Sequence, residues 1–480
     1  MRYKYRVVGW LLEGYARVAD FSAPSRAPGR IFGCGPLARR LLANTRMIMD
    51  FLTALTVLLC QDPPQQPPPA AKPEEPLIKT AIKQITLGGQ IRFRAEYRDP
   101  VAYTNLPASL DDDDIYLSRI RLNLRFSVND DLDVFLQPQD QRTFGDETSV
   151  LSDETNLDVH QGYAEMRNLG VEGLTLKVGR QELSYGDQRL VSPLDWSNIA
   201  RAWDGIKVRY ASGAFWVDGF ATVIKEGTGA EDDQDFYGLY TSYGGVEAHE
   251  FDLYVFGREF NDNSQPSETI PAAVNDRHDF TAGARLKGKA AGFDYTAEGM
   301  IQKGKAGDDD VDAWAAALTL GYTFDMDWKP RLGVEVTHAS GDEDPTDGAI
   351  ETFDPLYPFG HFYQGFSDVF SFRNGSDIMI SLKVIPVDTL SIQVDAHAFE
   401  LDQERDAWYN FAGAPIRRDV TGVADKEVGS EIDLHARLSV GKNLKIWAGW
   451  SHFFAGPYLE DTPGGDRDMN WFFLQTTVDF

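Results

Sequence analysis

The chain has 480 residues and a formal net charge of −28, and 42% of its residues are hydrophobic. This acidity argues against nucleic acid as a partner, because binding to phosphates requires clustered lysine and arginine side chains. No run of about 18–20 apolar residues is present, which argues against a helical membrane protein.

The first residues are predicted to target the chain rather than to fold. Three arginines precede the short apolar run 51–59, as is typical of a secretory signal, so residues 1–61 are predicted to be a signal or targeting segment. Met47 or Met49 is an alternative start. Both cysteines, Cys34 and Cys60, lie in this segment. Cys60 is a candidate for lipidation, although a small residue should precede it.

A proline-rich linker is predicted to follow over residues 62–84 and to lie in the periplasm. Its proline content favours an extended chain that does not join a packed core.

From residue 85 onward the hydrophobic pattern repeats with a period of two. In residues 115–128, for example, Ile120 and Leu122 alternate with Arg119 and Arg121. An extended strand sends successive side chains to opposite faces, so one face of this strand is apolar and the other is rich in arginine. The segments predicted to be strands are 87–98, 115–128, 132–141, 159–168, 173–181, 204–211, 214–223, 236–244, 249–258, 279–289, 293–302, 314–324, 330–339, 377–386, 389–400, 430–440, 443–453 and 470–480.

The connections between these segments alternate in length. Short turns such as Asn129-Asp130-Asp131 alternate with long connections, which are predicted at 99–114, 142–158, 182–203, 224–235, 259–278, 303–313, 340–376, 401–429 and 454–469. Bacterial outer-membrane barrels have short periplasmic turns and long extracellular loops. The pattern therefore predicts an all-β fold, a single antiparallel transmembrane β-barrel of about 18 strands over residues 85–480.

Aromatic residues near the strand ends support a membrane location. They match the aromatic girdles that barrels place at both membrane interfaces, and they are Tyr97, Tyr116, Phe126, Tyr210, Phe215, Phe251, Tyr295, Trp314, Tyr322, Phe324 and Trp450. The last strand ends in Phe480, which resembles the signal read by the barrel-assembly machinery of the outer membrane.

If the apolar face meets lipid, the polar face lines a lumen that is rich in cations. The predicted lumen cations are Arg92, Arg94, Arg119, Arg121, Arg125, Lys177, Lys207, Arg209, Arg258, Arg285, Lys287, Lys383 and Arg437. Acidic residues are fewer on these faces, since most of the excess acid lies in the loops. A lumen with such walls selects anions. The alternative is that the arginines pair with lumen carboxylates and only brace the barrel.

Other functions receive weaker support. Acidic loops such as 341–347 could hold Ca²⁺, but none has the spacing of a calcium loop, and no cofactor is expected. The aromatic segment 353–373 either stacks on sugars at the mouth or packs as a lid. GxSxG, HExxH and P-loop motifs are absent. His338 with Ser340, and Ser451 with His452, are the only hints of a barrel hydrolase, so no enzyme is predicted.

Residues 179–209, GRQELSYGDQRLVSPLDWSNIARAWDGIKVR, resemble a block found in the alginate-export family of outer-membrane porins, and residues 340–374 and 451–459 are similar to that family too. The resemblance implies an eighteen-stranded monomeric barrel with an electropositive constriction for a polyuronate. It also implies that residues of this block form or brace the inner wall, namely Arg180, Asp187, Arg189, Asp195, Trp196, Arg201, Trp203 and Asp204. Alternatively, these residues pin a loop shaped by its glycines and Pro193.

The sequence therefore predicts a pore in the bacterial outer membrane that passes anionic solutes, such as uronate or alginate-type saccharides, through a lumen lined by arginine and lysine. The expected partners are outer-membrane lipid, anionic carbohydrate and the barrel-assembly machinery. The alternatives are a general or sugar-uptake porin with bracing arginines and, more distantly, a barrel hydrolase.

Overall fold

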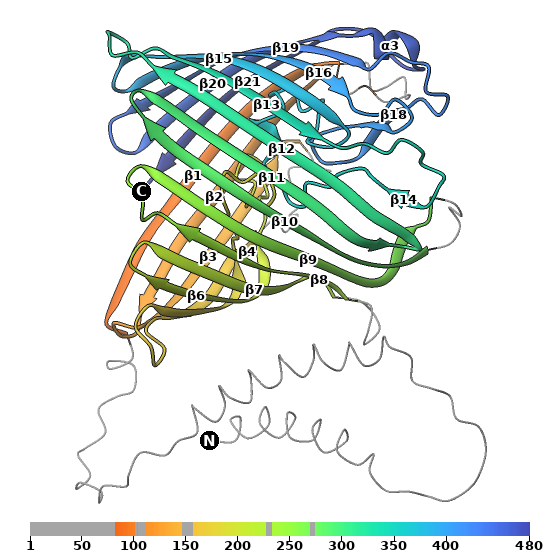
Figure 1. The fold of residues 1–480 in the computed structure, drawn as a ribbon. Coiled ribbons are helices and arrows are strands. Elements are labelled where there is room, and N and C mark those ends of the chain that lie inside the picture. The colour runs from red at the N-terminus through yellow and green to blue at the C-terminus, as the bar shows by residue number, and fades with distance from the viewer. Residues whose placement is uncertain (1–81, 101–102, 104–111, 146–156, 227–232, 269–273) are drawn as a thin grey trace, which may run out of the picture. The chain divides into compact units, whose positions relative to one another are not determined.

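A computed structural model describes residues 82–100, 103, 112–145, 157–226, 233–268 and 274–480 (Figure 1). The predicted targeting segment 1–61 and all but the last residues of the predicted linker lie outside the described residues. In the described part, no helix is long and apolar enough to cross a membrane.

Eighteen strands close into one antiparallel barrel, as predicted. They are β1 (Gln84–Asp99), β2 (Asp113–Ser127), β3 (Leu132–Thr143), β4 (Leu157–Met166), β5 (Leu174–Gln181), β6 (Trp203–Ser212), β7 (Phe215–Lys225), β8 (Gln234–Tyr243), β9 (His249–Pro266), β10 (Val274–Ala290), β11 (Phe293–Ala306), β12 (Asp309–Thr323), β13 (Arg331–Ala339), β15 (Gly375–Val387), β16 (Leu390–Leu401), β19 (Glu427–Val440), β20 (Leu444–Ala455) and β21 (Met469–Asp479). Each strand pairs with its neighbours, and β1 pairs with both β2 and β21, which closes the sheet.

The long connections contain the remaining elements. They are β14 (Ala349–Ile350), η2 (Gly360–Phe362), β17 (Ala407–Tyr409), β18 (Pro415–Arg418) and α3 (Pro457–Asp461). In Figure 1, β14, β18 and α3 gather at one end of the barrel, away from the C-terminus. This arrangement agrees with the prediction that the long loops share one end.

The predicted long connection at 303–313 is wrong. β11 continues to Ala306 and β12 begins at Asp309, so only two residues join them. The charged residues here are typical of a loop, but they form cross-strand ion pairs on the outer face: Lys303 with Asp312, and Lys305 with Asp310. The predicted loop at 259–278 is also shorter, because β9 extends to Pro266 and β10 begins at Val274.

The wall carries apolar side chains on its outer face and charged side chains on its inner face, which is the reverse of the arrangement in a soluble protein. On β2 the apolar Leu122 points outward and is 43% exposed, whereas Arg119 points into the barrel and is 1% exposed. Girdle aromatics such as Tyr116 and Trp314 are likewise exposed on the outer face. Apolar side chains can remain outside because lipid, not water, surrounds them.

Two long connections fold into the barrel and fill much of its interior. The β5–β6 loop (182–202) and the β13–β15 loop (340–374) meet in a short parallel bridge between Val191 and Tyr357. Ser192 N donates to Tyr357 O (3.0 Å), and Tyr357 N donates to Leu190 O (2.9 Å). Buried side chains of both loops then pack against inward-facing aromatics of β7, β8 and β9.

The aromatic segment 353–373 packs as part of this interior. Phe353 stacks edge-on against Phe372, and Phe370 stacks on Phe399 of β16. Phe353, Phe370 and Phe372 are buried, so they are not free to stack on sugars. Of the two predicted roles, packing is the one that these three residues have.

Candidate functional site: the constricted lumen

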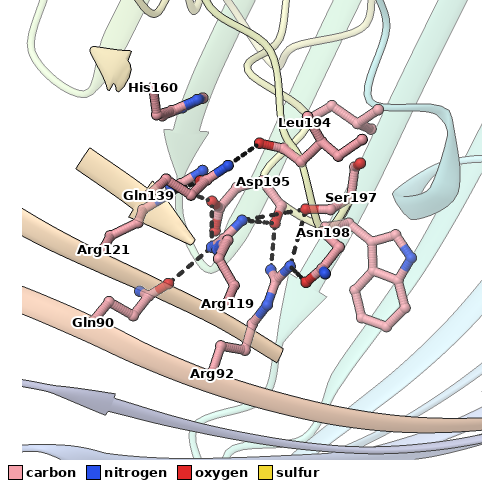
Figure 2. Close-up of polar contacts among 12 residues, drawn as sticks. Gln90, Arg92, Arg119, Arg121, Gln139, His160, Leu194, Asp195, Ser197 and Asn198 are labelled. Atoms are coloured by element: carbon pink, nitrogen blue, oxygen red, sulfur yellow. Dashed lines mark hydrogen bonds and ion pairs between the residues drawn. The ribbon is translucent and has the colours of Figure 1, made fainter. Parts of the chain in front are cut away.

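Three arginines of β1 and β2 surround one carboxylate of the β5–β6 loop (Figure 2). Asp195 Oδ1 accepts hydrogen bonds from Arg119 Nη2 (2.8 Å) and Arg121 Nη1 (3.0 Å), both from β2. Burial opposes the ionisation of Asp195, but Arg119, Arg121 and Arg92 outweigh it and hold the pKa of this carboxyl below its usual range. The Asp195 side chain is still 57% exposed to the lumen.

The same arginines also bind the backbone of the loop. Arg92 Nη1 donates to Asp195 O (2.6 Å), and its Nη2 donates to Ser197 O (2.9 Å). Arg119 Nη1 donates to the same two carbonyl oxygens at 3.1 and 3.2 Å. These contacts join the loop to β1 and β2, so Arg92 and Arg119 position it as well as giving the lumen its charge.

Arg94 of β1 also binds the backbone of this loop, at Trp196. Its Nη1 donates to Trp196 O (2.6 Å), and its guanidinium lies over the Trp196 ring at 3.8 Å. Arg94 Nε also pairs with Glu96 (2.6 Å). Trp196 in turn packs against Trp447 and Phe473, so the tip of the loop is held on an aromatic wall.

Other parts of the β5–β6 loop reach the far wall and the neighbouring loop. Asp187 Oδ1 accepts from Arg285 (3.0 Å) and Lys287 (2.7 Å) of β10. Arg189 pairs with Glu335 of β13 (2.8 Å). Arg201 Nη1 donates to Pro358 O in the β13–β15 loop (2.9 Å). The loop therefore spans the lumen from β1–β2 to β10–β13.

The β13–β15 loop has its own charged anchor. Asp354 accepts from Arg258 of β9 (2.7 Å) and pairs with Arg373 (2.9 Å). Arg258 also pairs with Asp279 of β10 (2.6 Å). Burial opposes the ionisation of Asp354, but Arg258 and Arg373 prevail and hold its pKa far below the usual range.

Carboxylates on the wall bind the backbone N–H groups of the same loop. Phe366 N donates to Asp433 Oδ2 (3.2 Å), and Ser367 N donates to Glu431 Oε1 (2.9 Å). Asp433 also lies 3.6 Å from His397. The barrel thus holds its loops with arginines on one side, which bind carbonyls, and carboxylates on another, which bind N–H groups.

A second group of cations lines the wall from β2 to β6, and within the described residues these cations pair with wall carboxylates rather than with the two infolded loops. Its five members are Arg125, Arg167, Lys177, Lys207 and Arg209, and they share three carboxylates, Asp133, Glu165 and Asp218. Tyr185 of the β5–β6 loop donates to one of these carboxylates, Asp218 (3.1 Å). The side chains of the cations are 17–41% exposed, and those of the carboxylates are 0–19% exposed. We call these five residues the basic stretch. Water in the lumen therefore meets more positive than negative charge here.

Cavities lie on both sides of the loop contacts. One of about 360 Å³ is lined by Arg94, Arg98 and Trp196 among others, beside the ends of β1 and β2 from which a long loop leaves. Another of about 320 Å³ is lined by Lys287, Lys383 and several carboxylates near the short turns. Arg437, close by on β19, lies over the Trp447 ring at 4.3 Å. Within the described residues, Lys383 and Arg437 have no carboxylate within ion-pairing distance.

Of the predicted wall residues of the 179–209 block, two face outward and one is buried against the β13–β15 loop. Arg180 is not a lumen residue: it shares the outward face of β5 with Val178 and pairs with Asp204 of β6 at 2.6 Å. Asp204 is outward for the same reason, since it lies two residues before the exposed Ile206. Trp203 is buried against Tyr357 of the β13–β15 loop.

Several charged residues of the lumen were not identified from the sequence. Arg167 belongs to the basic stretch but lies in a turn, just after β4. Arg331 pairs with Asp294 and lines the cavity near the short turns, at the very start of its strand. Asp354 stands in an aromatic loop. Each of these residues lies in a turn, at the end of a strand or in a loop, where the period-two pattern does not show whether a side chain faces the lumen.

No group of three or more His, Cys, Asp or Glu side chains in the described part has an arrangement that could hold a metal ion. His338 does not contact Ser340 but contacts Ser376, at 2.8 Å. His452 contacts Asn470, on the face opposite to the buried Ser451.

A closed eighteen-stranded barrel with an apolar outer face and a charged, loop-constricted lumen defines a channel of the bacterial outer membrane. The alginate export family matches residues 83–473, and the chain belongs to that family.

Solved structures of porins share this fold. The outer membrane protein OprD from Pseudomonas aeruginosa is 14% identical with a TM-score of 0.54, and the match covers 83% of this chain and 94% of that one. OccK11 (OpdR) from the same organism is 12% identical with a TM-score of 0.55, and the match covers 83% of this chain and 96% of that one. No curated protein matches the sequence.

Proposed function

We propose that this channel prefers anionic solutes and that its substrates are acidic saccharides of the uronate or alginate type. The observation that carries the proposal is the basic stretch, where five cations share three less exposed carboxylates along one side of the lumen. In a narrow passage with low-dielectric walls, such an excess lowers the electrostatic barrier for carboxylates. Membership of the alginate export family supports the same substrate class.

The second candidate is a general or sugar-uptake porin. It is favoured by the arginines at Asp195, because Arg92, Arg94 and Arg119 direct donors at loop carbonyls and so brace the constriction. Bracing and selectivity are compatible, since within the described residues the cations of the basic stretch pair with wall carboxylates and not with either loop.

Further parts of the proposal concern how the channel works. One chain forms the whole pore, and passage requires no cofactor and no covalent chemistry. Residues 1–61 export the chain, and the linker that follows, up to the start of β1 at Gln84, remains in the periplasm. Phe480, whose backbone pairs with Gly89 and whose side chain is exposed, is presented to the barrel-assembly machinery.

Flux into proteoliposomes tests the substrate class. A labelled uronate disaccharide is expected to enter several times faster than a neutral disaccharide of the same size at low salt. Its advantage should shrink in 1 M salt, where the Debye length falls to about 3 Å. Equal rates for the two sugars at low salt would contradict the proposal and favour the general porin.

A further inference from the structure

The outer wall of the barrel carries an apolar groove across β9 to β13. Its volume is about 850 Å³, and its floor follows one row of paired residues: Leu253, Ala284, Gly299, Ala316 and His338, one from each successive strand. All five lie on the outward, membrane-facing side of the wall, as does Leu318 beside them.

The groove exists because the three middle residues of this row, Ala284, Gly299 and Ala316, are small and the side chains around them are large. Ile301 and Trp314, both about half exposed, border Gly299 and Ala316 on one side, and Leu318 borders them on the other. A Cβ added at Gly299 would meet no atom within 4 Å, so the space above the floor is open.

The groove has one polar end. His338 Nδ1 is 2.8 Å from Ser376 Oγ on β15, which continues the same row, and His338 Nε2 is 3.9 Å from Asp402. The Trp314 ring lies 4.7 Å from the His338 ring. Tryptophan is enriched where the bilayer meets water, and β13 ends one residue after His338. The polar end therefore lies at the level of lipid headgroups.

We propose that this groove is a binding site for one acyl chain of a membrane lipid, with His338 and Ser376 recognising the polar ester or amide region of that lipid. Four strand-to-strand steps of about 4.8 Å separate Leu253 from His338, which gives a trough of about 19 Å, suited to a long acyl chain. An ordered lipid gains contacts along both borders that a flat barrel wall does not offer. The site lies outside the lumen and is independent of the proposed solute preference.

Native mass spectrometry of the protein purified from outer membranes in mild detergent tests the proposal. The unaltered protein should retain about one lipid per barrel, and the measured mass distinguishes a phospholipid from a lipid A molecule. Gly299→Leu and Ala316→Leu fill the trough and should abolish retention. Ala221→Leu is the matched control, because Ala221 is exposed on the outer face of β7, away from the groove, and should leave retention unchanged.

Three results would overturn the proposal. One is equal lipid retention by the filled variants when their heat-modifiable migration on gels shows a folded barrel. Another is equal loss of lipid in the Ala221→Leu control. The third is release of fatty acid by the unaltered protein that stops with Ser376→Ala, which would make Ser376 a nucleophile and the site a hydrolase. The distance of 3.9 Å from His338 to Asp402 is beyond hydrogen-bond reach and favours binding.

Discussion

Replacing Arg92 and Arg119 together by alanine is expected to raise the single-channel conductance several-fold. Both side chains donate to the carbonyl oxygens of Asp195 and Ser197, and these contacts hold the β5–β6 loop against β1 and β2. Without them the loop carbonyls can bind lumen water instead, and of the arginines of β1 and β2 only Arg94 and Arg121 still hold the loop, so it loosens from the wall and the passage widens. Conductance of single channels in planar bilayers measures the effect.

Arg180→Ala is the matched control for this pair. Arg180 is also an ion-paired arginine of the wall, but it lies on the outer face of β5, where it pairs with Asp204. The control should change conductance little. An unchanged conductance in the double variant would show that these arginines do not hold the constriction.

Replacing Asp354 by alanine is expected to release the β13–β15 loop and to destabilise the barrel. The substitution removes one carboxylate from Arg258 and Arg373, and Arg258 is buried. Loss of one partner of a buried ion pair costs on the order of 3 kcal/mol, and Asp279 remains to offset part of this. Urea unfolding in detergent measures the stability, and hydrogen exchange over 353–373 reports the loop.

The same contact has a defined pH dependence. Because the pKa of Asp354 is depressed in the folded protein, its stabilisation is present above the ordinary aspartate pKa of about 3.9 and is lost as the pH falls below it. Glu343→Ala, at an exposed position in the same loop, is the control and should have little effect. If Asp354→Ala had the same stability and hydrogen exchange as the unaltered protein, the assigned role of Asp354 would be refuted.

The barrel could be predicted from the sequence because its signal is local and repeated. Period-two alternation fixes which residues share a face, and it located every one of the eighteen strands. The same rule shows why Arg180 was misplaced. It is three residues from the inward Lys177 and therefore on the opposite face, whereas its resemblance block had suggested the inner wall.

The constriction could not be predicted in the same way. Arg119 and Arg92 bind backbone carbonyls. Every residue has a backbone carbonyl, so the sequence does not show which of them an arginine will bind. The pairing of Asp354 with Arg258 joins residues 96 positions apart, so the local sequence around one residue does not reveal the other as its partner. The sequence predicts many of the lumen arginines, although not Arg167 or Arg331, but only the fold separates those that hold loops from those that face the passage.

The measurement that tests the central claim most directly is the reversal potential in a planar bilayer under a KCl gradient. The unaltered channel should show anion preference, which should fall when Arg125, Lys177, Lys207 and Arg209 are changed together to glutamine. Arg180→Gln, which alters the outer face of the same wall, should leave it unchanged. A channel without anion preference, or one whose preference survives the fourfold change, would contradict the assignment of the basic stretch as the selective wall.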